Sequence, residues 1–498
     1  MMVQPATPAA RISKRLTAQD ASFVYSESFH GPTHIGSLSF FEGQVGYEDV
    51  ARQVMERIHL IPRYRQRLQF VPFNLNHATW EDDLDFDIAR HVFYHPMPPG
   101  TSDEAAVAAA MGFHETILDR GRPLWEMHVF DGLEGDRTLV HWKVHHCMVD
   151  GVSGMELTTV LFDFEAEAQP PEPPAEPWQP QPAPGPAEAL TAAMLDLGQQ
   201  QLDAARRTQE LFRDTETLTA RMTLLMQAGQ ALSEMGSTPA VGAPWNRPPI
   251  SSKRSFAWSR FSFGEVRGIR GVLGGTVNDV VLALLGEAAA RYLAEHGVEV
   301  SGRKLRIGCP VSVRREGETG ALGNRVSMMF VALSASPMPA TERLAEVVIA
   351  TQRVKERREP QGMEAMMETT EAMPPGLIGM LSAVSTASLD AMTNMALAIP
   401  QLPGLANLPV PPPAINFVAT NVPGVQVPQY LAGRRMLDSI GLIPLAGTLG
   451  YGVAIQTYNQ NLYIGMMAEP RVMPDVRRMK DHVEAAYASL REAALAAG

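Results

Sequence analysis

The chain has 498 residues, of which 45% are hydrophobic and 19% charged, and its formal net charge is −12. This length predicts two domains with a linker, and the balance of apolar and charged residues excludes disorder over most of the chain. The acidic charge and the lack of a long Lys/Arg run in the sequence exclude a nucleic-acid-binding protein.

Cysteine content and the start of the sequence predict the compartment. Cys147 and Cys309 are the two cysteines, which form neither a disulfide framework nor a CxxC metal motif. Residues 1–15 are rich in Pro and Ala and then basic, and no apolar stretch follows, so they lack the pattern of a signal peptide. We therefore expect a cytoplasmic protein.

A proline-rich segment divides the chain. Residues 169–186 contain nine prolines in 18 positions, and proline fixes φ and lacks an N–H donor, so this segment predicts an extended linker. The proline-free stretch 187–235 predicts one or two long helices. We expect an N-terminal domain over residues 1–168, a linker and helical connector over 169–244, and a C-terminal domain over 245–498.

Several segments have the pattern of β-strands. Residues 138–146 place Val140, Trp142, Val144 and His146 on one face by alternation of apolar and polar positions. Further strands are expected at residues 304–313, 326–333, 414–420, 451–457 and 461–466, of which the last two form a hairpin.

The sequence HHCMVDG at residues 145–151 follows the first of these strands and precedes an expected helix. His146 then stands at the end of a rigid strand, and a neutral imidazole, with a pKa of about 6.5, can accept a proton from an alcohol. A covalent intermediate is not indicated, because Cys147 points to the opposite face of the strand. The pattern also fits a purely structural His pair before a turn at Asp150 and Gly151, or, with less support, a metal site.

A second pattern begins at Thr276, which suits the N-cap of a helix with Asp279 three residues later. The helix is expected to end near residues 296–297. Asn278 then lies in the first turn, where its amide could donate a hydrogen bond to a developing oxyanion. Helix capping alone is the alternative explanation.

These residues resemble the motifs of one family. HHCMVDG resembles the HHxxxDG motif of the bacterial wax ester synthase/diacylglycerol acyltransferases, and more distantly that of chloramphenicol acetyltransferase and of peptide-synthetase condensation domains. The resemblance extends over residues 16 to 490 and includes three further motifs: PLW at Pro123, Leu124 and Trp125; ND at Asn278 and Asp279; and NVP at Asn421, Val422 and Pro423.

The resemblance implies an α/β fold of two chloramphenicol-acetyltransferase-like domains with the active-site tunnel between them. It implies that His146 is the general base and that His145 supports it. Asp150 would orient the loop, Gly151 would leave room for substrate, and Asn278 would stabilise the oxyanion.

The remaining motif residues are expected at the substrate-binding side. Asp279 would be a cap, the residues from Asn421 to Gly424 would shape the tunnel wall, and Pro123 to Trp125 would pack beside the active site without a chemical role. Thr33 stands where the family more often has Met, which could alter a lipid-facing wall.

The implied reaction esterifies a long-chain fatty alcohol or diacylglycerol with long-chain acyl-CoA as co-substrate, without a cofactor, a metal or a nucleic-acid partner. We expect a peripheral contact with a membrane or lipid droplet, with the methionine-rich residues 363–395 as the candidate surface. Candidates for contacts with the coenzyme A phosphates are Arg63, Arg65, Arg67, Arg303, Lys304 and Arg306.

Two alternatives remain at the level of sequence. One is a related HHxxxDG acyltransferase that acts on a glycolipid, a polyketide or a carrier-bound thioester. The other is a non-catalytic protein that binds lipid droplets.

Overall fold

The computed structural model describes residues 14–148, 157–238, 240–312, 326–358, 360–362, 415–445 and 447–498. The helices and strands used below have the following bounds: α1 Ala18–Ser26, β1 His34–Glu42, α2 Tyr47–Arg57, β2 Gln66–Gln69, β3 Thr79–Asp82, β4 Val92–Thr101, α3 Asp103–His114, β5 Trp125–Leu133, β6 Arg137–His145, α5 Pro186–Arg213, α6 Thr215–Ser237, β7 Ser255–Ser262, α7 Phe263–Leu273, α8 Val277–Glu295, β8 Lys304–Ser312, β9 Val326–Ser334, α9 Ala340–Glu356, β10 Phe417–Val422, β11 Tyr430–Leu431, β12 Arg434–Leu442, β13 Tyr451–Tyr458, β14 Asn461–Ala468 and α12 Val476–Ala497. Short 3₁₀ helices lie at Ile58–Leu60 (η1), Pro62–Arg65 (η2), Pro72–Asn74 (η3), Ile88–Arg90 (η4) and His146–Met148 (η5).

The N-terminal half is built on a six-stranded sheet with the order β11-β12-β1-β6-β5-β4. β6 lies at its centre and pairs antiparallel with both β1 and β5, while β4 and β5 are parallel. Val140, Trp142 and Val144 point into the same apolar core, as their alternation predicts. β2 and β3 form a separate two-stranded ribbon.

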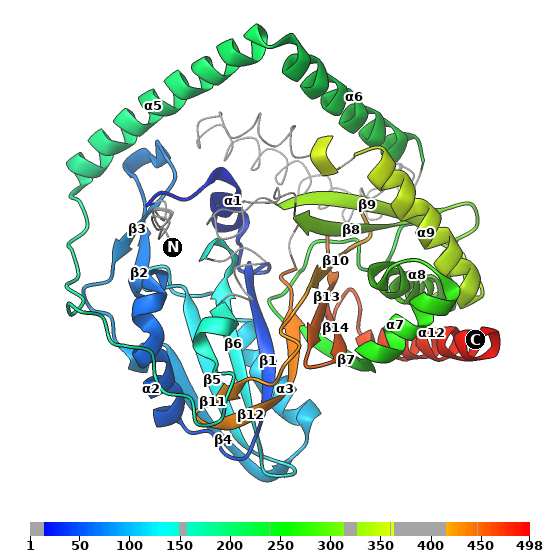
Figure 1. The fold of residues 1–498 in the computed structure, drawn as a ribbon, viewed down its shortest axis with the longest axis horizontal. Coiled ribbons are helices and arrows are strands. Elements are labelled where there is room, and N and C mark those ends of the chain that lie inside the picture. The colour runs from blue at the N-terminus through cyan, green and yellow to red at the C-terminus, as the bar shows by residue number, and fades with distance from the viewer. Residues whose placement is uncertain are drawn as a thin grey trace, which may run out of the picture.

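The C-terminal half is built on a second six-stranded sheet with the order β7-β14-β13-β10-β8-β9, and α7, α8, α9 and α12 lie on one side of it (Figure 1). β10 is parallel to both of its neighbours. α8 is apolar on all sides because it is buried along most of its length against this sheet and the other helices.

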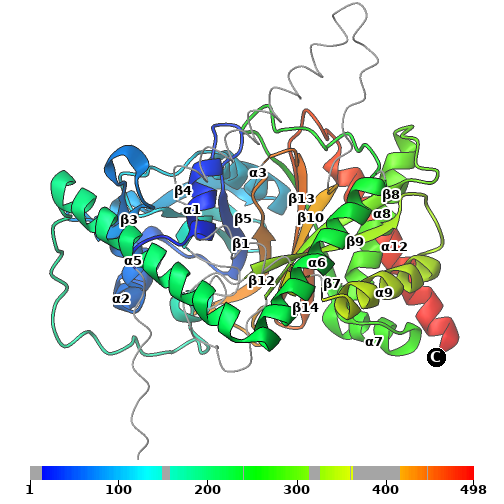
Figure 2. The ribbon, with the colours of Figure 1, turned by 90° about the horizontal axis from the view of Figure 1, so that it is seen from above.

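The two halves are joined in two ways. β11 and β12, which come from the C-terminal part of the chain, complete the N-terminal sheet, and β12 pairs with β1. β12 also packs on the second sheet, where a Cβ added at Gly465 would lie 2.6 Å from the carbonyl oxygen of Gly441, so glycine permits the close approach. The connector forms two helices, α5 and α6, that arch from one half to the other (Figures 1 and 2).

Most expected elements lie within two residues of their observed bounds. The expected strand at residues 414–420 is shifted, because β10 runs from Phe417 to Val422. The turn of the predicted hairpin is formed by Asn459 and Gln460, which both have positive φ angles of 43° and 63°.

Candidate active site

The histidine pair lies where β6 ends. His145 is the last residue of β6 and stands opposite His34 on β1, whereas His146 begins the 3₁₀ turn η5. The prediction that His146 continues the strand is therefore wrong by one residue. Two backbone hydrogen bonds hold this end of the strand: the His145 N–H donates to Leu124 O at 2.9 Å and the His146 N–H to Thr33 O at 3.1 Å.

His145 is fully buried, and its ring is bound on both sides. Nδ1 accepts a hydrogen bond from the backbone N–H of Cys147 at 3.1 Å, so the proton of the neutral ring is on Nε2. Nε2 lies 3.1 Å from the hydroxyl oxygen of Thr33 and 3.5 Å from Oε1 of Glu27. This ring is therefore occupied by protein groups and is not placed to act on a substrate. Thr33 touches this histidine and does not line a lipid wall.

Glu27, which follows α1, has a side chain that is only 1% exposed. Burial opposes ionisation of this carboxyl group, but hydrogen bonds from His145, the Thr33 N–H and Arg120 outweigh it and lower the pKa of Glu27 to about 2. Arg120 donates to Glu27 Oε2 at 2.9 Å. A buried carboxylate thus stands behind the histidine pair.

His146 is half-buried and lies against α1. The ring of Phe23 stacks on it with a centroid distance of 3.8 Å and an interplanar angle of 7°. Cys147, its neighbour, is 4% exposed, and burial raises the pKa of its thiol. A buried thiol that stays protonated is a poor nucleophile.

The PLW residues support the turn from behind. Pro123, Leu124 and Trp125 are all buried. Leu124 supplies the carbonyl that binds the His145 N–H, and the Trp125 indole donates to the Tyr64 carbonyl at 2.9 Å. These contacts place the PLW residues against the end of β6.

The ND and NVP motifs meet in the second half of the molecule. Thr276 caps α8 in a capping box with Asp279, as predicted, and the Asp279 carboxylate also accepts from Thr351 at 2.8 Å. The Asn421 Nδ2 group donates to Asn278 Oδ1 at 3.0 Å. This bond occupies the carbonyl oxygen of Asn278. The two asparagines come from α8 and β10, whereas His146 follows β6.

Val422 pairs with Gln456, and Pro423 is exposed at the end of β10. Asp150 and Gly151 lie outside the described residues, as does the methionine-rich stretch 363–395.

The sequence did not indicate that Phe23, Glu27 and Arg120 lie around the histidine pair, or that Thr33 contacts it directly. Phe23 and Glu27 are four residues apart around the end of α1, a spacing that places two side chains on one helix face. That spacing was the available signal, but it does not show which residues the face meets.

A layer of five histidines lies beside the pair in the N-terminal half: His34, His95, His114, His128 and His141, hereafter the histidine layer. His114 Nδ1 is 3.2 Å from His141 Nε2, and His95 Nε2 is 3.1 Å from His128 Nδ1. Burial lowers the pKa of all five, and those of His34, His114 and His141 lie well below the usual value.

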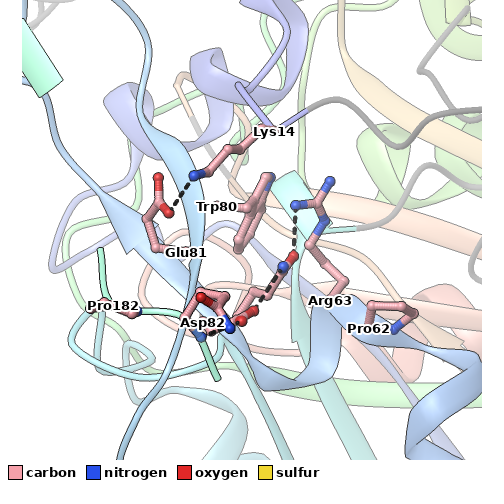
Figure 3. Close-up of a pocket in the computed structure, with 9 residues that line it drawn as sticks. Lys14, Pro62, Arg63, Trp80, Glu81, Asp82 and Pro182 are labelled. Atoms are coloured by element: carbon pink, nitrogen blue, oxygen red, sulfur yellow. Dashed lines mark hydrogen bonds and ion pairs between the residues drawn. The ribbon is translucent and has the colours of Figure 1, made fainter. Parts of the chain in front are cut away.

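A cavity of about 340 Å³ opens between β3, η2 and the proline-rich linker (Figure 3). The guanidinium of Arg63 lies over the Trp80 ring at 4.6 Å, and Lys14 pairs with Glu81 at 2.7 Å. Because Glu81 and Asp82 offset the two cations, we assign this cavity no ligand.

The other candidates for phosphate contacts are separated. Arg65 lies over Trp178 at 4.3 Å, and Arg306 is buried and donates to the Thr238 carbonyl. The structure does not bring the six candidates together as one cluster.

Metal-ligand clusters and single membrane-spanning helices are both absent from the described residues. No group of three or more His, Cys, Asp or Glu side chains there could hold a metal ion. None of the helices there is by itself long and apolar enough to cross a membrane, and the α7–α8 pair, which meets the length and composition criteria together, is bent by 94°.

The arrangement of the two sheets and their helices is similar to that of solved condensation domains. The first condensation domain of the CDA synthetase matches with a TM-score of 0.55 and 13% identity, over 97% of both chains. The wax ester synthase/diacylglycerol acyltransferase from Marinobacter aquaeolei VT8 matches with a TM-score of 0.63 and 22% identity, over 96% of this chain and 99% of that one. The expected α/β fold is confirmed.

The sequence comparisons narrow this class. The model of the wax ester synthase/diacylglycerol acyltransferase catalytic domain matches residues 16–281, and that of the WS/DGAT C-terminal domain matches residues 322–491. A Mycobacterium tuberculosis protein named "Probable diacyglycerol O-acyltransferase tgs1" is 28% identical over 485 residues, which cover 95% of each chain. The chain belongs to the wax ester synthase/diacylglycerol acyltransferase family and is an acyl-CoA-dependent O-acyltransferase.

Proposed function

We propose that the protein transfers a long acyl chain from coenzyme A directly to the hydroxyl of diacylglycerol or a long-chain alcohol, with His146 as general base. The observation that carries this proposal is the position of His146: it lies half-buried in the 3₁₀ turn that directly follows a central strand, and its backbone and ring are both held in place. A fixed imidazole needs little reorganisation to accept a proton.

The step balances without a covalent enzyme intermediate. His146 takes the proton of the acceptor hydroxyl as its oxygen attacks the thioester carbonyl. The tetrahedral intermediate then collapses, the carbon–sulfur bond breaks, and the coenzyme A thiolate takes the proton from His146. The products are one ester and free coenzyme A, and the imidazole is neutral again.

Asn278 is our candidate for the oxyanion donor. The bond from Asn421 to Asn278 Oδ1 supports this role, because it turns the NH₂ group of Asn278 away from that partner and leaves a donor for the substrate. Asp150 and Gly151 are proposed to orient the loop and to leave room for substrate, and His145 is proposed to support the turn.

Diacylglycerol is the acceptor that the names of the mycobacterial relatives favour. Acyl chains and diacylglycerol are poorly soluble in water, so we propose that the protein works in the cytoplasm at the surface of a membrane or lipid droplet. The coenzyme A phosphates are proposed to bind Arg or Lys side chains.

The test is an assay of purified protein with palmitoyl-coenzyme A and either dioleoylglycerol or hexadecanol, with thiol release and the extracted ester measured together. His146→Ala is the test variant, and His59→Gln, which changes a histidine on η1, is the matched control. We expect triacylglycerol or wax ester from the native protein and the control, and a loss of about 10³-fold or more in His146→Ala. Full activity in His146→Ala would exclude this residue as the base.

A further inference from the structure

We infer that α1 and the residue after its end, Glu27, form a clamp that sets the position of His146, with Phe23 and Glu27 as positioning residues. The inference rests on the proposed role of His146. The clamp has two arms, Phe23 and Glu27, and each arm contacts one histidine of the pair. Phe23 touches His146, and Glu27 touches His145.

The first arm acts on the ring of His146 directly. The two rings are nearly parallel at 7° and 3.8 Å apart, so Phe23 covers one whole face of the imidazole. The backbone of Phe23 is tied down as well, because its carbonyl accepts a hydrogen bond from the Thr33 hydroxyl at 3.0 Å. Rotation of His146 away from this plane would lose the stacking contact.

The second arm acts through His145. The Glu27 carboxylate faces Nε2 of His145, and Nδ1 of the same ring accepts the Cys147 N–H, which lies in the first turn after His146. A carboxylate on one side therefore fixes the tautomer that can bind a backbone N–H on the other side. The Glu27 carboxylate therefore influences the conformation of η5 through the His145 ring.

Further contacts keep Glu27 charged and in place. The Thr33 N–H donates to Oε1 at 3.2 Å, and Arg120 donates to Oε2 and also to the carbonyl of Val24 on α1 at 2.7 Å. Thr33 in turn supplies the carbonyl that binds the His146 N–H. The clamp is a closed set of contacts, so a loss of either arm should loosen the catalytic turn without unfolding the domain.

The test compares Glu27→Gln and Phe23→Leu with a closely matched control, Glu115→Gln. Glu115 is also a buried carboxylate that accepts one backbone N–H, from Arg254 at 2.8 Å, and pairs with one cation, Lys253 at 2.8 Å, but it does not touch the histidine pair. We expect both clamp variants to lower kcat by about 10- to 100-fold, with KM for palmitoyl-coenzyme A changed by no more than about twofold. Glu115→Gln should lose a similar amount of thermal stability and keep its kcat.

A second readout does not depend on activity. Diethyl pyrocarbonate acylates exposed neutral imidazoles, and mass spectrometry of the peptide that contains His146 measures the rate. Phe23→Leu should raise this rate several-fold, because one face of the ring becomes accessible, while Glu115→Gln should not.

The outcomes separate the clamp from the proposed function. Unchanged kcat in both Glu27→Gln and Phe23→Leu, with an inactive His146→Ala, would overturn the clamp and leave the base in place. Full activity in His146→Ala would refute the role of His146 as general base, on which the clamp rests. A fall in kcat in Glu115→Gln equal to that in Glu27→Gln would show a general loss of stability, which also overturns the clamp.

Discussion

We predict that the histidine layer makes the folded state less stable in mild acid. His34, His114 and His141 have pKa values held well below 6.5, first by burial and then by neighbouring cations such as Lys143, while the unfolded chain titrates near 6.5. The unfolded state therefore binds more protons than the folded state as the pH falls below neutrality. The free energy of unfolding is therefore unaffected by the titration of these rings above pH 7. It decreases progressively as the pH falls toward the pKa values that the rings have in the folded state.

The size of the effect follows from the titration of the unfolded chain. When the pH falls from 7.5 to 5.5, each ring that stays neutral in the folded state lowers the free energy of unfolding by about 1.4 kcal/mol. Three such rings lower it by about 4 kcal/mol. That is a large part of the 5–15 kcal/mol that typically separates folded and unfolded states.

The assay is urea denaturation of the native protein and of His141→Gln at pH 7.5 and 5.5. A glutamine amide can keep the hydrogen bond to His114 but does not titrate, so the pH-dependent loss should shrink by about 1.4 kcal/mol whatever the absolute stability of the variant. His59→Gln, outside the histidine layer, should keep the native slope. An identical pH dependence in His141→Gln and the native protein would refute the reasoning.

Three further changes test other parts of the structure. Gly36→Ala should destabilise the protein by about 1–3 kcal/mol in thermal denaturation, because the added Cβ would overlap a backbone carbonyl of β6. Arg343→Met should cost about 3 kcal/mol in urea, because it removes a fully buried partner of the fully buried Glu287 carboxylate. Asn421→Asp should lower kcat by about 10²-fold with little change in stability, because an aspartate can only accept and would turn the amide of Asn278 around.

Local patterns in the sequence predicted local structure well. Alternation placed the faces of β6, the Thr276–Asp279 spacing gave the start of α8, and the lack of proline gave the two connector helices. These features depend on neighbours within a few residues, where side-chain period and capping chemistry act directly.

The parts that could not be predicted depend on contacts between distant residues. Asn278 and Asn421 are 143 positions apart, and their hydrogen bond follows from the packing of α8 against the second sheet. Glu27 has the sequence context of a surface residue. Its side chain is nevertheless buried, because Arg120 and His145, from other parts of the chain, pack against it. A single sequence contains no periodic signal for such pairs.

The same long-range dependence connects the catalytic turn to the end of the chain. Thr33, which binds the His146 N–H, immediately precedes β1, and β1 is held on one side by β6 and on the other by β12. The pairing of Gly36 with Leu442 joins residues about four hundred positions apart. Contacts of such high sequence separation carry a cost in loop-closure entropy and slow folding. β1, which follows Thr33, is therefore paired on both edges only when β12 has been added. For this reason the histidine motif, although it lies in the first third of the chain, is positioned by residues from the last fifth.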